Sequence, residues 1–321
     1  MLRLLSISAA MALTAGVSTA QADCGDVSIT EMNWASSAVV THVSKFIMEQ
    51  GYGCKVSTVP SATLPALVSV AETNTPDIVT ELWINGTPAY DKLSEEGKIQ
   101  TLTDVLSDGG VEGWWVPKSL VDEKPELATV EGIIANKDLF NGRFHSCPEG
   151  WGCKNTNEDM TKAFGLVDAG FEIFQHGSGE TLATSIAAAF ENKEPWLGYY
   201  WAPTAILGKY PMVSVDLGEH DPEIFKCMAD AECDSVGKSS FPVGPVKTVV
   251  TTDFQTRNAE IADLMSKVAF TNEQMGSVLS WKEANKASNE EAAVHFLTKY
   301  PTVWSGWISA EAKAKLSALL K

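Results

Sequence analysis

Strand-like and helix-like segments alternate along the first third of this 321-residue chain. DVSITEMNW at 26–34 has the composition of a strand, and SSAVVTHVSKFIMEQGYG at 36–53 has the apolar spacing of a helix. CKVSTVP at 54–60, SATLPALVSVAET at 61–73 and DIVTELWI at 77–84 continue the pattern as strand, helix and buried strand. Such βαβαβ alternation predicts a parallel sheet wrapped by helices.

The pattern changes near GWWVP at 113–117, where a second set of helices and strands begins. FPVGPVKTVVTT at 241–252 reads as a strand that returns to the first set, and the chain is helical from 256 onward. We therefore predict two α/β lobes, lobe 1 from 23–116 and 246–321 and lobe 2 from 117–245. The two chain crossings would form a hinge, with a ligand in the cleft between the lobes.

Residues 1–22 have the pattern of a secretory signal peptide. A short basic start, MLR, precedes the apolar run LLSISAAMALTAGV and the small-residue ending STAQA. The apolar run is too short to span a bilayer. Asp23 stands before Cys24, where a lipidated cysteine requires a small residue, so we expect no lipid anchor. The mature chain is expected in the periplasm.

Six cysteines in an exported chain can all form disulfides. Fifteen pairings are formally possible. Proximity favours one of them, since two pairs are close in sequence and the remaining two cysteines precede or begin neighbouring predicted strands. The expected disulfides are Cys24–Cys54, Cys147–Cys153 and Cys227–Cys233.

Acidic residues dominate the mature chain. With Arg3 removed, 23 basic side chains face 41 acidic ones, a formal charge of −18. Nucleic acids and anionic membrane surfaces need a basic face, so we expect neither as a partner. Only Arg143 and Arg257 remain as arginines, which favours a ligand without a carboxylate.

Catalytic motifs are missing from the sequence. It contains no HExxH, GxSxG, Walker loop or GxGxxG, and no two of its five histidines are four residues apart. We therefore expect a protein that is not an enzyme and needs no cofactor, with a secreted enzyme as the remote alternative. The KNTNED segment offers oxygens suited to Ca²⁺ but lacks EF-hand spacing, so a structural Ca²⁺ stays open and no ligands are assigned. Those oxygens belong to Asn155, Asn157, Glu158 and Asp159.

CPEGWGC at 147–153 places a tryptophan on a small loop between two cysteines. Packing of Trp151 against its own domain is one explanation. The other is ligand recognition, because a trimethylammonium group donates no conventional hydrogen bond and is bound through π faces and apolar area. A disulfide that holds the loop rigid would then lower the entropy cost of presenting Trp151 to a ligand.

Several segments resemble the substrate-binding proteins of ABC importers for glycine betaine, choline and related osmolytes. They are ELWINGTPAYDKL at 81–93, CPEGWGC, YYWAPT at 199–204, FTNEQMGSVLSWKEAN at 270–285 and VWSGWI at 303–308, so the resemblance spans nearly all of the mature chain. The order NW, ELW, GWGC and YYW is most similar to the members that bind trimethylamine N-oxide. The family implies a two-lobe periplasmic-binding-protein fold (type II-like), a closing cleft and an ABC permease in the inner membrane as partner.

The resemblance also implies an aromatic box for a quaternary ammonium group. The family box corresponds to Trp83, Trp151 and Trp201, and the narrower likeness adds Trp34. Trp34 and Trp83 end predicted strands of lobe 1, whereas Trp151 and Trp201 belong to lobe 2, so closure would complete the box. The expected ligand is trimethylamine N-oxide, with glycine betaine, choline and carnitine as alternatives, bound by a monomer.

The polar end of the ligand is less well defined by the sequence. Backbone amides of Gly152 and Cys153 can donate hydrogen bonds to an N-oxide or a carboxylate. Glu131 in TVEGII can supply a carboxylate to the cationic side of the ligand. An exposed glutamate near a helix start explains Glu131 equally well, and the sequence does not decide between the two.

Overall fold

The computed structural model describes residues 24–230, 233 and 237–320, so the predicted signal peptide lies outside the described residues. The strands are β1 (Asp26–Met32), β2 (Lys55–Ser61), β3 (Ile78–Trp83), β4 (Ile99–Pro117), β5 (Arg143–Ser146), β6 (Glu172–Gln175), β7 (Gly198–Ala202), β8 (Met212–Ser214) and β9 (Gly244–Thr251). None of the helices in the described part is long and apolar enough to cross a membrane.

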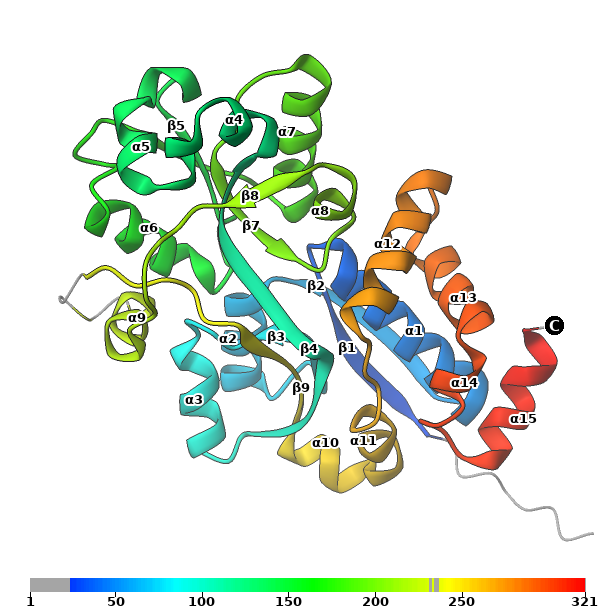
Figure 1. Ribbon diagram of the computed structural model, residues 1–321. Helices are drawn as coiled ribbons and strands as arrows, with labels where there is room; N and C mark the ends of the chain where they lie inside the picture. Colours follow the sequence, from blue (N-terminus) through cyan, green and yellow to red (C-terminus); the bar gives the residue numbers. More distant parts are fainter. Residues whose placement is uncertain (1–23, 231–232, 234–236, 321) are drawn as a thin grey trace, which may run out of the picture.

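The helices surround the sheet on both faces (Figure 1). Those packed with β1 to β3 and β9 are α1 (Ala35–Tyr52), α2 (Thr63–Thr73), α3 (Pro88–Glu95), α10 (Thr252–Arg257), α11 (Ala259–Met265), α12 (Asn272–Asn285), α13 (Asn289–Lys299), α14 (Pro301–Trp304) and α15 (Ala310–Leu319). The other half contains α4 (Lys118–Glu123), α5 (Val130–Ala135), α6 (Cys153–Ala163), α7 (Gly179–Asn192), α8 (Ala205–Lys209), α9 (Pro222–Ala229) and the 3-10 turns η1 (Pro125–Ala128) and η2 (Lys137–Phe140).

The sheet has the strand order β2-β1-β3-β9-β4-β7-β5-β6, with β8 paired to β4. The predicted parallel arrangement is confirmed for β2, β1 and β3, but β9 runs antiparallel to both β3 and β4. The first part of β4 pairs with β9 and its last part pairs with β7 and β8. This 19-residue strand therefore belongs to both halves of the molecule (Figure 1).

Two hydrophobic cores lie on opposite faces of the first half of the sheet. One core contains α1 and α11 to α15, and the other contains α2 and α3 and continues into the second half. Helix α1 fits its place because Val39, Val43 and Ile47 recur at four-residue spacing and are fully buried. The helix ends at Gly53, whose left-handed φ of 74° lets its N–H bond the carbonyl of Glu49.

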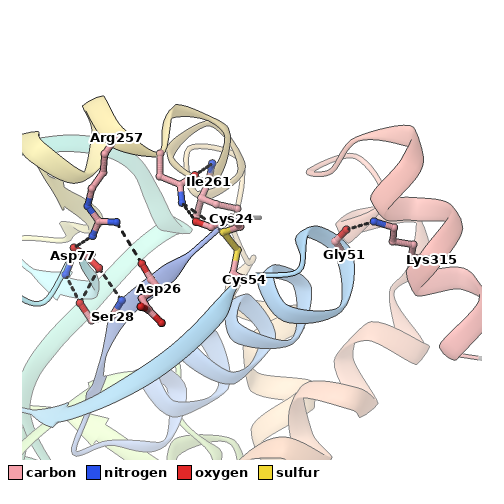
Figure 2. The surroundings of a disulfide bond; sticks show 10 residues. Cys24, Asp26, Ser28, Gly51, Cys54, Asp77, Arg257, Ile261 and Lys315 are labelled. Atoms are coloured by element: carbon pink, nitrogen blue, oxygen red, sulfur yellow. Dashed lines mark hydrogen bonds and ion pairs between the residues drawn. A yellow bond between two sulfur atoms is a disulfide. The ribbon is translucent and has the colours of Figure 1, made fainter. Parts of the chain in front are cut away.

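The three predicted disulfides are present: Cys24–Cys54, Cys147–Cys153 and Cys227–Cys233. Figure 2 shows the first of them beside the start of β1. Next to it Asp77 accepts hydrogen bonds from the backbone and hydroxyl groups of Ser28 and pairs with Arg257. The disulfide and this ion pair hold the starts of β1, β2 and β3 together, which fixes the strands whose far ends carry Trp34 and Trp83.

Candidate functional site

A small cavity of about 20 Å³ lies where the two halves of the sheet meet. Its walls combine residues from β3, β4, β7 and the loops that follow β1 and β5. All four predicted tryptophans line it, together with both residues of the predicted amide pair. The lining residues are Trp34, Thr63, Trp83, Asn85, Glu112, Trp151, Gly152, Cys153, Tyr199 and Trp201.

The tryptophan rings stand at steep angles to one another. Trp151 lies between Trp34 and Trp201, with ring centroids 5.0 Å apart in both pairs and interplanar angles of 68° and 79°. Trp83 contributes from the last position of β3, where the parallel strands β1 and β3 end at the same edge of the sheet. Rings at such angles form the walls of a box rather than a stack, an arrangement suited to surrounding a tetrahedral cation.

The loop that carries Trp151 contacts the other half of the molecule directly. The indole nitrogen of Trp151 donates a 2.7 Å hydrogen bond to Oδ1 of Asn33, which follows β1. A Cβ on Gly152 would lie 2.5 Å from the hydroxyl oxygen of Thr87. The loop backbone can therefore pack this closely against Thr87 because residue 152 has no side chain. The Cys147–Cys153 disulfide closes this loop at its base.

Replacing both Cys147 and Cys153 by serine is expected to weaken ligand binding by less than Trp151→Ala does. The loop loses its covalent closure, but Trp151 keeps its bond to Asn33 and its contacts with two other indoles. Isothermal calorimetry on the two variants checks the order, with the Cys227→Ser, Cys233→Ser double variant as the matched control. An affinity loss larger than that of Trp151→Ala would contradict this ranking.

Polar groups gather on one wall of the cavity. Tyr199 donates a 2.7 Å hydrogen bond from its hydroxyl to Glu112, and Asn85 bonds the same carboxyl group. Burial raises the pKa of Glu112 to about 7, although both hydrogen bonds act in the opposite direction. Burial and the neighbouring Glu112 raise the pKa of Tyr199 well above its usual value, so its hydroxyl stays a proton donor.

A second carboxyl group stands behind the indoles. Oε1 of Glu81 accepts hydrogen bonds from the indole nitrogens of Trp34 at 2.6 Å and Trp83 at 3.3 Å. Burial raises the pKa of Glu81 to about 7, against the lowering effect of its hydrogen-bond donors. Glu81 therefore connects two of the four tryptophans without lining the cavity itself.

Glu131, the carboxylate suggested by the sequence, is not brought to this cavity. It is exposed in the first turn of α5, where Thr129 caps the helix, which fits the alternative of a surface residue near a helix start. Glu112, Glu81, Tyr199 and Asn85 were missed. Tyr199 belongs to the motif YYW, and Glu81 and Asn85 belong to ELWIN, but β4, whose last part places Glu112 opposite Trp201, was not predicted as a strand.

The residues considered for Ca²⁺ lie on α6, and three of the four, Asn157, Glu158 and Asp159, have protein partners. Asn157 accepts from the indole nitrogen of Trp114 and donates to the carbonyl of Cys153. Glu158 pairs with Lys154 and accepts from Gln175, while Asp159 pairs with Lys162. Within the described ranges no group of three or more His, Cys, Asp or Glu side chains is arranged to hold a metal ion.

Solved structures share this architecture. The glycine betaine/L-proline-binding protein of Borrelia burgdorferi has a TM-score of 0.73 and 17% identity, covering 91% of this chain and 99% of that one. A choline-binding protein of an ABC transporter in complex with choline has a TM-score of 0.71 and 17% identity, covering 93% and 99%. These likenesses confirm the predicted two-lobe, type II-like periplasmic-binding-protein fold.

Sequence comparison gives a relative and a family. The trimethylamine N-oxide-binding protein of Pelagibacter ubique (strain HTCC1062) is 23% identical over 323 residues, 95% of this chain and 99% of the relative. The family described as the substrate-binding domain of the ABC-type glycine betaine transport system matches residues 25–299. This protein therefore belongs to the substrate-binding domains of ABC-type glycine betaine transport systems.

Proposed function

We propose that this protein captures trimethylamine N-oxide in the periplasm and delivers it to the permease of an ABC importer. The observation that carries the proposal is the cavity in which four tryptophans from both halves of the chain converge. Such π faces select a trimethylated ammonium group, and its methyl groups bury apolar area against them. The name of the Pelagibacter ubique relative supports the choice within this ligand class.

The polar wall supports a ligand without a carboxylate. A carboxylate at this end would face the acidic side chain of Glu112, and burial already disfavours charge on that group. An N-oxide oxygen is instead a strong acceptor. Protonated Glu112, with a pKa of about 7, would donate a hydrogen bond to it, while Asn85 and the backbone at Gly152 and Cys153 offer further donors.

Closure of two lobes around the ligand follows from the strand arrangement. We place lobe 1 at 23–116 and 246–321 and lobe 2 at 117–245, so that the boundaries fall at the end of β4 and near the start of β9. Trp34 and Trp83 then come from lobe 1, and Trp151 and Trp201 from lobe 2. A ligand that touches all four rings stabilises the closed form, which the permease would recognise.

Calorimetry against trimethylamine N-oxide, choline, glycine betaine, carnitine and trimethylamine tests the function. We expect trimethylamine N-oxide to bind best. It has about five heavy atoms, and the best small ligands reach roughly −1.5 kcal/mol per atom, so its dissociation constant should be roughly micromolar or weaker. Best binding of proline or another amino acid without methylated nitrogen would refute the proposal, and conversion of the ligand, detected by mass analysis, would indicate an enzyme.

A further inference from the structure

Glu81 is a fully buried carboxyl group directly behind the tryptophan rings. One oxygen accepts three hydrogen bonds, from the indole nitrogens of Trp34 and Trp83 and from the hydroxyl of Ser36 at 2.6 Å. The other oxygen, Oε2, is also buried, and no atom of the described residues donates to it. All three donors are neutral, so the side chain has no cation beside it to balance an ionised carboxylate.

The backbone of Glu81 is strained as well. Its φ is +50°, a region that costs energy for any residue other than glycine. A bulge accompanies it, since the pairing of β3 with β9 shifts register between Val79 and Leu82. A buried, partly unsatisfied and strained glutamate costs folding free energy, and such costs concentrate at ligand sites.

We propose that Glu81 is the counter-charge of the tryptophan cage: its carboxylate holds the indoles of Trp34 and Trp83 and makes the cavity prefer an ammonium group to a neutral group of the same shape. Two physical effects contribute. An anion attracts the ligand's cation through a poorly polarisable interior. A carboxylate bonded to an indole N–H also increases the electron density of the ring face that the cation meets. This role rests on the function proposed above.

If Glu81 is the counter-charge, its titration should make ligand binding depend on pH. Because burial raises its pKa to about 7, part of the population is protonated near neutral pH. A bound cation favours the ionised form of Glu81, so binding should release a proton from Glu81. In a Glu112→Gln variant, where Glu112 does not titrate, affinity should rise with pH and level off above about 7. Other charged or titratable groups on the elements packed around Glu81 include Glu31, His42, Asp77, Asp104, Glu112, Glu180, Lys247, Arg257, Lys282 and Glu283.

Most of those groups are engaged elsewhere. Glu31 pairs with His42, Lys247 with Asp104, and Arg257 with Asp77. Glu112 is the important exception, because it lines the cavity and its pKa is also about 7. Any proton release must therefore be measured in a Glu112→Gln variant as well as in the unmodified chain.

Glu81→Gln separates charge from shape, because glutamine keeps an acceptor for the three donors. Two isosteric pairs are measured: trimethylamine N-oxide against tert-butanol, and choline against 3,3-dimethylbutan-1-ol. In Glu81→Gln, the ratio of affinities for the ammonium compound and its carbon isostere should fall by about tenfold or more, in whichever pair contains the ligand that binds. The affinity for the isostere itself should stay nearly unchanged. Glu72→Gln, an exposed position on α2, is the matched control and should change neither.

The outcomes separate the two proposals. An undiminished preference in folded Glu81→Gln overturns the role of Glu81 and leaves the function standing, whereas no binding of any trimethylated ammonium compound by the unmodified chain overturns both. If Glu81→Gln does not fold, calorimetry of Glu112→Gln in two buffers of different ionisation enthalpy, between about pH 6 and about pH 7.5, decides instead. Proton release on ligand binding supports the role of Glu81, and its absence overturns it.

Discussion

Alanine at Trp83, Trp151 or Trp201 is expected to weaken binding of the trimethylated ligand roughly tenfold or more at each position. A desolvated cation–π contact contributes on the order of 1 to 2 kcal/mol, and alanine removes both the π face and the apolar wall. Trp151 should show the largest loss, since its ring contacts Trp34 and Trp201 and its nitrogen bonds Asn33. Calorimetry gives the affinities, and circular dichroism checks that the fold is kept.

Trp281→Ala provides the control for these variants. Trp281 lies on α12, where its ring stacks on His295 with centroids 3.9 Å apart, and it does not line the cavity. Its removal should cost stability without changing affinity. If the three cavity variants bind within about twofold of the unmodified chain while remaining folded, the ligand site lies elsewhere and the aromatic-cage proposal is wrong.

The parts of the fold that the sequence predicted well are those set by local pattern. Alternation and helix periodicity placed β1, α1, β2, α2 and β3 to within a few residues, because each segment carries its own apolar spacing. Of the two crossing strands, β9 was also predicted to within a few residues, whereas β4 was not. Most of β4 lies in IQTLTDVLSDGGVEG, which contains two adjacent glycines and several acidic residues, and its strand conformation depends on pairing with β9 and β7.

The same limit explains which parts of the site were missed. The tryptophans were predicted because the ability of an indole ring to bind a cation is a property of the single residue, and because these residues stand in short motifs. Glu81 and Glu112 are ordinary acidic residues in sequence, and their character comes from burial and from partners up to 87 positions away, such as Tyr199. Nothing in the sequence distinguishes Glu131 from these two glutamates, but in the structure it lies on an exposed helix face.

Gly110→Ala is expected to reduce affinity at least as much as Trp83→Ala does, although Gly110 does not line the cavity. Gly110 pairs with Gly244 where β4 and β9 cross between the halves. A Cβ there would lie 2.1 Å from Cζ3 and 2.4 Å from Cη2 of Trp83, so the ring must move. Overpacking of this kind costs typically about 1 to 3 kcal/mol of stability. Thermal unfolding and calorimetry measure both effects.

The atoms that would collide with the methyl group added by Gly110→Ala belong to the six-membered part of the Trp83 indole, which phenylalanine at that position does not reach in the same way. Adding Trp83→Phe to Gly110→Ala should therefore restore part of the lost stability, a non-additivity expected for residues in direct contact. Gly276→Ala is the control, since its Cβ would meet nothing within 4 Å on α12 and alanine favours a helix. If Gly110→Ala behaves like Gly276→Ala, Trp83 has room to move, and close packing against β4 does not position its ring.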